Sequence, residues 1–344
     1  MLKGIGSLLA VVAVCACGLT AWADVVIDSV TVGNPGNAGE WSGQSYGGAG
    51  PDRICGAVSY TYDIGTYEVT AGQYTDFLNS VAVTDTYGLY NPYMHYDAYP
   101  NELGCNIQRT GSPGSYSYSV APDWANRPVN YVSWGDAARF SNWLHNGQPT
   151  GLQDLDTTED GSYYLNGATT AAELVSVVRE SDASWVIPSE DEWYKAAYHK
   201  NDGGTGNYYD YPMSDDGVPS NQLVDPDPGN SANFYQTEYG YTIGGPYWRT
   251  EVGEFENSAS PYGTFDQGGN VWEWNEAIPY TESRGLRGGA FGNYEEYYDL
   301  HAAWRGNDSA AVEGEWIGFR LSQVPEPATS VLLTLAAVGF IRRR

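Results

Sequence analysis

The sequence is poor in basic residues, cysteine and histidine, and these shortages exclude several classes of function. Lysine and arginine total 16 against 43 acidic residues, which gives a formal net charge of −27. A surface this acidic repels a phosphate backbone, so we expect no nucleic-acid partner. The 4 histidines are widely spaced, and the chain has no paired cysteine motif or phosphate-binding loop. The sequence therefore carries none of these common signatures of catalysis.

The composition indicates one folded, loop-rich domain with targeting segments at its ends. Hydrophobic residues make up 42% of the chain and aromatic residues 14%, whereas charged residues make up only 17%. These values do not describe a disordered chain. A length of 344 residues is enough for one large domain with a substantial core.

Residues 1–23 have the organisation of a signal peptide. Lys3 precedes an apolar run over residues 5–16, and Ala21-Trp22-Ala23 offers a small-residue cleavage site before Asp24. We therefore expect signal peptidase to release an exported chain that begins at Asp24. A lipoprotein anchored through Cys17 is the alternative.

Residues 323–344 form a second addressing segment. A proline motif at 324–327 is followed by an apolar run over 328–341 and three arginines. The run is shorter than a full membrane span, which needs about 20 residues. The three arginines favour a C-terminus that stays on the cytoplasmic side. This end resembles the PEP-CTERM sorting signal of bacterial surface proteins. The resemblance implies transient membrane anchoring and removal by an exosortase, and a fortuitous membrane anchor is the alternative.

Cleavage of the signal peptide would leave Cys55 and Cys105 as the remaining cysteines. An even pair in an exported chain suggests one disulfide bond. Two unrelated buried thiols are the alternative.

Three capped helices are predicted in the body of the chain. Each starts with a hydroxyl residue followed three positions later by a side chain that can complete a capping box, and an apolar stripe comes next. The three pairs are Thr70 with Gln73, Ser133 with Asp136, and Ser189 with Glu192. An apolar alternating run over 25–32 predicts an edge strand, and the pattern over 64–69 predicts another strand. Long loops separate these elements.

The most distinctive stretch is a glycine-rich turn leading into a strand at 262–276. Alternation places Val271 and Glu273 on one face of this strand and Trp272 and Trp274 on the other. A carboxylate among so many apolar side chains needs a partner. Together with Asp266, Glu273 could bind calcium in an oxygen cage that includes backbone carbonyls. A buried turn with an acid at the rim of the fold is the alternative.

Six ordered motifs resemble those of sulfatase-modifying-factor domains, which include the formylglycine-generating enzymes. They are GTYEVT at 65–70, PVNYVSW at 128–134, IPSEDEW at 187–193, GNVWEW at 269–274, RGGAF at 287–291 and IGFR at 317–320. The resemblance assigns residues 56–322 to this domain and leaves 24–55 as an N-terminal extension. It implies a variant C-type-lectin-like α+β fold with low regular secondary structure and few short helices, stabilised by calcium.

The resemblance also implies the ligands of two calcium ions. The first would be bound by the side chains of Asp266 and Glu273 and the carbonyls of Gly269 and Val271. The second would use Asn233 and the carbonyl of Phe234, but its downstream aspartate has no clear counterpart in this sequence.

Oxidase members of the family bind copper through two cysteines, because soft thiolates select Cu(I). The corresponding positions here are Asn293 and Tyr298, and no cysteine follows Cys105, so we expect neither copper nor formylglycine production. The resemblance implies that the neighbouring groove survives, with the residues Arg287, Phe291, Asn293, Tyr298, Trp304, Arg305 and Arg320.

The predicted function is a non-catalytic module, located at the cell surface, in the matrix or secreted, that binds an extracellular glycan or peptide. An enzyme is the alternative, either a formylglycine-generating oxidoreductase or another enzyme that uses the same groove.

Overall fold

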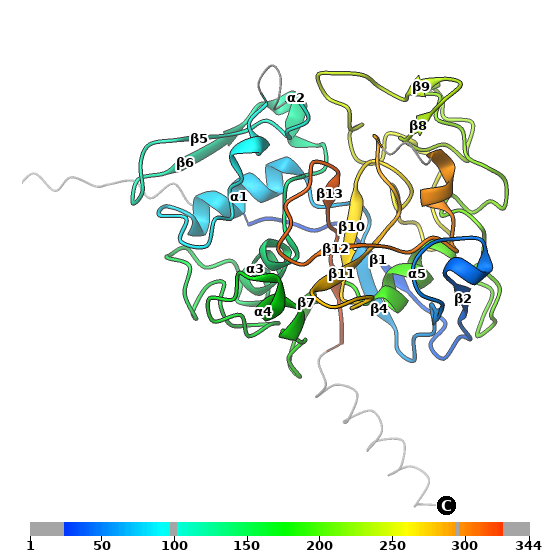
Figure 1. Ribbon diagram of the computed structural model, residues 1–344, viewed down its shortest axis with the longest axis horizontal. Helices are drawn as coiled ribbons and strands as arrows, with labels where there is room; N and C mark the ends of the chain where they lie inside the picture. The colour runs from blue at the N-terminus through cyan, green and yellow to red at the C-terminus, as the bar shows by residue number, and fades with distance from the viewer. Residues whose placement is uncertain (1–23, 97–101, 293–295, 326–344) are drawn as a thin grey trace, which may run out of the picture.

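The computed structural model describes residues 24–96, 102–292 and 296–325 (Figure 1). The predicted signal peptide and the predicted sorting segment beyond Pro325 lie outside the described residues. No helix in the described ranges is long and apolar enough to cross a membrane. Short strands and helices alternate with long loops, as the sequence predicts for an α+β fold with little regular structure.

Two four-stranded sheets form the centre of the molecule. The first has the order β1 (Ser29–Val32), β4 (Tyr62–Gly65), β14 (Ser322–Gln323), β7 (Trp185–Val186). The second has the order β12 (Gly306–Ser309), β11 (Ser283–Arg287), β10 (Trp272–Asn275), β13 (Ile317–Gly318). All their pairings are antiparallel except that of β10 with β13.

Three two-stranded ribbons surround these sheets. They are β2 (Glu40–Ser42) with β3 (Arg53–Cys55), β5 (Ile107–Thr110) with β6 (Ser117–Val120), and β8 (Tyr235–Gln236) with β9 (Gly240–Tyr241).

The predicted N-terminal extension is integrated into the fold. β1 pairs with β4 from Ser29 opposite Gly65 to Val32 opposite Tyr62, and it lies at the edge of its sheet as predicted. β2 and β3 also lie within residues 24–55. This segment therefore supplies an edge strand and a ribbon to the domain.

The structure confirms the three predicted helices and their caps. α1 (Ala71–Val81), α3 (Trp134–His145) and α5 (Glu190–Tyr198) each begin with a complete capping box, which satisfies backbone N–H groups that the helix leaves unpaired. A fourth capping box, Thr170 with Glu173, starts α4 (Ala171–Ser176) and was not predicted. The remaining helices are α2 (Pro122–Ala125) and the 3₁₀ helices η1 (Gln44–Tyr46), η2 (Pro92–Met94) and η3 (Glu296–Leu300).

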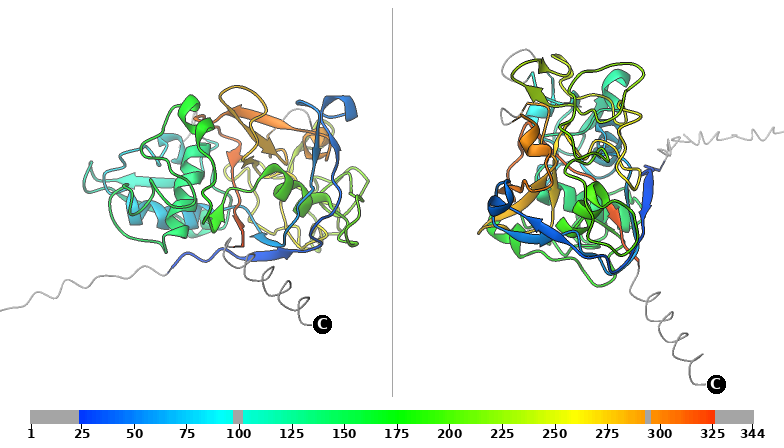
Figure 2. Two further views of the ribbon diagram at one scale, coloured as in Figure 1. Left: turned by 90° about the horizontal axis from the view of Figure 1, so that it is seen from below. Right: turned by 90° about the vertical axis from the view of Figure 1, so that its right-hand side faces the viewer.

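The helices lie on two sides of the sheets: α1 and α3 on one side and α5 on the other (Figures 1 and 2). Aromatic rings join α1 and α3 to the end of β13. The ring centroids of Phe77 and Phe140 lie 5.1 Å apart, and those of Phe140 and Phe319 lie 5.5 Å apart. Burying each such side chain stabilises the fold by about 1.5–3 kcal/mol. This packing fixes the position of Arg320, the next residue in the chain.

Candidate functional site

The tryptophan motif forms β10, and all four residues of this strand are buried. Nε and Nη2 of Arg320 donate to the two carboxylate oxygens of Glu273 at 2.5 and 2.7 Å. Nε1 of Trp193 also donates to Glu273, at 2.6 Å. On the other face, Trp274 donates to the carbonyl of Val132 at 3.0 Å. Glu273 is therefore an interior acid neutralised by an arginine, and it does not lie at the rim.

The loop before β10 is curled by residues in the left-handed region of backbone space. Asp266, Gly269 and Asn270 have φ angles of 60°, 90° and 55°. A Cβ on Gly269 would lie 2.3 Å from the carbonyl oxygen of Asn233, so this position requires glycine. Asn233 donates from Nδ2 to Oδ1 of Asn270 at 2.8 Å. This contact places Asn233, a predicted ligand of the second calcium ion, next to the loop that is predicted to bind the first calcium ion.

The oxygen atoms of this loop suit a hard cation such as calcium, and an oxygen of the neighbouring Asn233 lacks a partner. Oδ1 of Asn233 is buried without a hydrogen bond. Oδ2 of Asp266 accepts the N–H of Gly253 at 2.6 Å, and burial raises the pKa of this carboxyl to about 6. No three His, Cys, Asp or Glu side chains in the described ranges are arranged to hold a metal. A calcium ion here would therefore need amide and backbone carbonyl ligands as well.

The second predicted calcium position combines the free Oδ1 of Asn233 with a carbonyl that already has partners. The carbonyl of Phe234 already accepts hydrogen bonds from Nδ2 of Asn221 at 3.1 Å and from the hydroxyl of Thr242 at 3.2 Å. A cation would have to compete with these donors.

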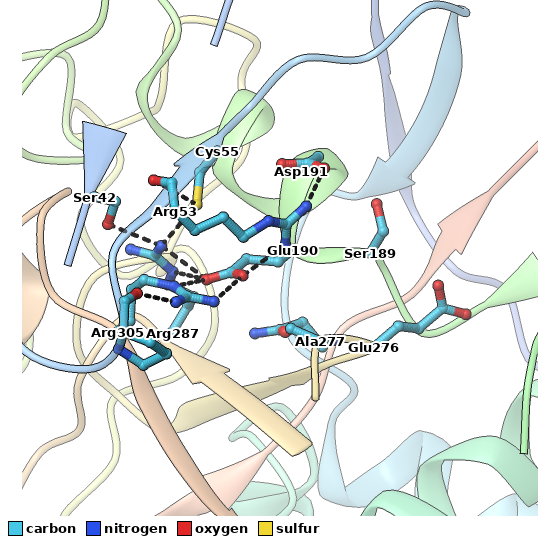
Figure 3. A network of polar contacts seen from close by, with 12 residues as sticks. Ser42, Arg53, Cys55, Ser189, Glu190, Asp191, Glu276, Ala277, Arg287 and Arg305 are labelled. Atoms are coloured by element: carbon cyan, nitrogen blue, oxygen red, sulfur yellow. Dashed lines mark hydrogen bonds and ion pairs between the residues drawn. The ribbon is translucent and has the colours of Figure 1, made fainter. Parts of the chain in front are cut away.

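A second buried cluster surrounds Glu190, the first residue of α5 (Figure 3). Arg287 and Arg305 donate to its two carboxylate oxygens at 2.8 and 2.6 Å, and Arg53 donates at 2.8 Å. Burial alone would raise the pKa of Glu190, but the guanidinium groups outweigh this effect and lower the pKa to about 2. Glu190 is therefore a firmly ionised acid that joins α5 to β3, β11 and the segment before β12.

A family match covers most of the chain. Residues 53–324 match the sulfatase-modifying factor enzyme 1-like domain. The chain belongs to this family. The matched range runs from the start of β3 to just beyond β14, and so contains every strand of the two central sheets except β1. None of the curated proteins matches the chain.

CarF is one of the solved structures with a similar fold. Its alignment with this chain has 20% identity and a TM-score of 0.45, and it covers 87% of this chain and 99% of CarF. Treponema denticola variable protein 1 has 20% identity and a TM-score of 0.51, with coverages of 86% and 95%. PvdO from Pseudomonas aeruginosa has 18% identity and a TM-score of 0.47, with coverages of 86% and 94%. The likeness to the Treponema protein, together with the family match, confirms the predicted variant C-type-lectin-like α+β fold.

The sulfatase-modifying-factor domain of this chain does not present the predicted groove residues on an open surface. Four of these residues are buried: Arg287, Phe291, Arg305 and Arg320. The three arginines are paired with Glu190 or Glu273. Trp304 is half-buried. Tyr298, on η3, is 49% exposed, and Asn293 lies outside the described residues. The four buried side chains therefore stabilise this domain and do not line a groove.

Cys55 and Cys105 are both free, which contradicts the predicted disulfide bond. Cys55 packs among aromatic side chains that include Trp193 and Tyr194 of α5. Cys105 belongs to a different cluster, the main core that also contains α1 and α3. Burial raises the pKa of both thiols, that of Cys55 to about 11. The structure thus supports the alternative of two unrelated buried thiols.

We expect denaturation of the chain beginning at Asp24 to expose two free thiols without any reductant. Because both sulfurs are buried, the native protein should react slowly with a thiol reagent. The measurement is a thiol titration before and after addition of guanidinium chloride, and a reduced, denatured sample serves as the control. A titration that finds thiols only after reduction would restore the disulfide.

Sequence reasoning missed the buried roles of Glu190 and Glu68. Glu190 follows the N-cap Ser189, where an acid is common because it interacts favourably with the helix dipole. Its position gave no sign of three arginine partners. Glu68 lies within the first family motif and is 2% exposed, and no periodic pattern marked it as interior.

Proposed function

We propose that this protein is an exported, non-catalytic member of the sulfatase-modifying-factor family that binds an extracellular glycan or peptide. The main observation in support of this proposal is the position of the two thiols. Copper oxidase chemistry requires two thiolates that can bind one Cu(I) ion. Cys55 and Cys105 lie in separate buried clusters, and burial raises the pKa of both. Neither thiol is therefore suited to replace the missing cysteine pair.

The features at the two ends of the sequence support export. Signal peptidase would cleave before Asp24, and an exosortase would remove the segment that starts near Pro325. The expected location is the cell surface, the extracellular matrix or the medium, with only transient membrane anchoring by the C-terminal segment. The acidic composition is compatible with a calcium-containing exterior.

Exposed aromatic side chains support a glycan or peptide ligand. Trp41 and Tyr46 stack with their ring centroids 5.3 Å apart and their planes inclined by 7°. They are 50% and 46% exposed, so they leave apolar ring surface open to solvent. Tyrosine and tryptophan are enriched at interfaces because each combines apolar area with a polar atom. This pair is the best candidate for a contact surface in the described structure.

Calcium is the expected structural ion of the proposed module. The loop at 266–273 supplies carboxylate and carbonyl oxygens, which are the donors that calcium prefers. Oxygen ligands of this kind do not select copper. A bound calcium would hold the left-handed backbone of this loop in place and would stabilise the folded state by mass action.

The proposal predicts binding without turnover. The protein beginning at Asp24 is applied to a glycan array and a peptide array, and separately is loaded with copper and incubated under oxygen with a cysteine-containing sulfatase peptide. We expect a glycan or peptide hit that Trp41→Ala weakens, and no aldehyde by mass spectrometry. The control variant is Tyr280→Ala, which removes another exposed ring, 53% accessible. Aldehyde above the no-protein background would favour the enzyme alternative.

A further inference from the structure

Glu68 is buried with both of its carboxylate oxygens unpaired. The residue is 2% exposed, and neither oxygen has a hydrogen-bond partner. Its own backbone N–H is close enough to influence the pKa of the carboxyl but does not reach hydrogen-bonding geometry. An unpaired buried carboxylate costs several kcal/mol. The carboxyl must therefore either be protonated or be bound by a group that the described residues do not supply.

The nearby guanidinium of Arg320 cannot be that group, because it has no donor left. A guanidinium carries five N–H donors. Nε and Nη2 use two of them on Glu273, at 2.5 and 2.7 Å. The other three reach the carbonyls of Phe265 at 2.8 Å, Gly65 at 2.9 Å and Thr66 at 3.3 Å. Arg320 is thus fully engaged, and its charge is balanced by Glu273.

The charges that remain uncompensated belong to Glu68 and Asp266. The backbone beside Asp266 lies against the segment that carries Glu68, because the N–H of Phe265 donates to the carbonyl of Thr66 at 2.8 Å and the ring centroids of Tyr67 and Phe265 lie 5.7 Å apart. Asp266 has the N–H of Gly253 as a partner, which is a neutral donor. With Glu273 neutralised by Arg320, ionising both of these acids would place two negative charges close together. One divalent cation would balance them.

A cavity lined in part by Glu68 offers room for water ligands beside the two acids. It has a volume of about 420 Å³ and lies between the segment before β1, the start of α1 and α2. Its lining includes Asp28, Tyr67, Glu68, Gln73 and Asn126. Calcium takes about six to eight oxygen ligands and accepts water among them. Two carboxylates with backbone carbonyls and water could complete such a set without a third acidic side chain.

We propose that Glu68 and Asp266 together bind one divalent, oxygen-preferring cation of the calcium class. Glu68 thereby becomes a ligand beyond the four residues that the family resemblance assigns to the first ion. Its carboxylate supplies the free negative charge that Glu273, engaged by Arg320 and Trp193, lacks. This inference rests on the calcium site included in the proposed function.

The test is calcium binding by the protein beginning at Asp24 and by its Glu68→Gln variant, measured by isothermal titration calorimetry after removal of metal with a chelator. Glutamine keeps the shape of the side chain and removes its charge. We expect the variant to bind calcium more than about tenfold more weakly than the parent protein. Without calcium the variant should melt at or above the temperature of the parent, since the amide removes an uncompensated buried charge.

The matched control is Glu276→Gln, the same substitution at a half-buried acid that accepts hydrogen bonds from Arg179 and Tyr163. Arg179 keeps Glu192 as a partner. We expect Glu276→Gln to lower the melting temperature equally with and without calcium and to leave the calcium affinity within about twofold.

Two results would overturn the inference, and they are distinguishable. Calcium affinity in Glu68→Gln within twofold of the parent would show that Glu68 is not a ligand, while the calcium site at 266–273 would stand. A parent protein that binds no calcium would remove both the inference and the calcium part of the proposed function. Terbium luminescence excited through Tyr67, which lines the cavity, provides a second readout that does not depend on stability.

Discussion

The Glu190→Gln variant is expected to lose about 3–5 kcal/mol of unfolding free energy, because the substitution leaves buried arginines without their counter-ion. Arg287 is fully buried and Arg305 nearly so, and both donate to the Glu190 carboxylate. The amide would keep the size of the side chain but would present an N–H group to guanidinium donors. Chemical denaturation measures the loss.

The control for this prediction is Glu251→Gln. Glu251 pairs with Arg127 at 3.8 Å, and its side chain is 46% exposed. Surface ion pairs contribute about 0–1 kcal/mol, so this variant should unfold almost like the parent protein. Equal losses in the two variants would mean that the buried cluster is no more important than a surface pair.

The Glu190 carboxylate gives the free energy of unfolding a definite pH dependence. Burial raises the pKa of Glu190, yet Arg287 and Arg305 outweigh it and lower the pKa from 4.5 to about 2. A depressed pKa contributes stability that is fully present above the unfolded-state value and is lost as the pH falls through the folded-state value. The parent protein should therefore lose this contribution between about pH 4.5 and 2, and Glu190→Gln should lack that part of the acid sensitivity.

The local features of the fold could be predicted because their determinants lie within a few residues of one another. A capping box joins positions three apart, so Thr70, Ser133 and Ser189 could be identified as helix starts from sequence alone. The edge position of β1 agreed with its short alternating run. The six ordered motifs identified the family and hence the fold, which composition could not do.

The interior charges could not be predicted, because their partners are distant in sequence. Glu190 meets arginines 53, 287 and 305, and no local pattern links them. The family resemblance placed Arg287, Arg305 and Arg320 in a groove, and arginine is rarely buried unless it is paired. The disulfide prediction failed for a similar reason: counting cysteines does not show which packing cluster each one joins.

The ion pair between Arg320 and Glu273 is expected to show the strongest coupling in the domain. Both side chains are fully buried, and Arg320 also donates to three backbone carbonyls. We expect Arg320→Met to lose about 3–5 kcal/mol of unfolding free energy, since it leaves Glu273 charged and unpaired. Glu273→Gln should lose a similar amount, because it leaves the guanidinium without a counter-ion.

The double variant decides whether the pair acts as a unit. Once Arg320 is gone, replacing Glu273 removes a charge that no longer has a partner, so the combined loss should be smaller than the sum by about 1–3 kcal/mol. Arg320→Met combined with the surface change Glu251→Gln should instead be additive to within about 0.5 kcal/mol. Additive losses for Arg320 and Glu273 would mean that the carbonyl contacts of Arg320, rather than the ion pair, hold this part of the domain together. They would also weaken the assignment of a divalent cation to Glu68 and Asp266, because that assignment requires Arg320 to neutralise Glu273.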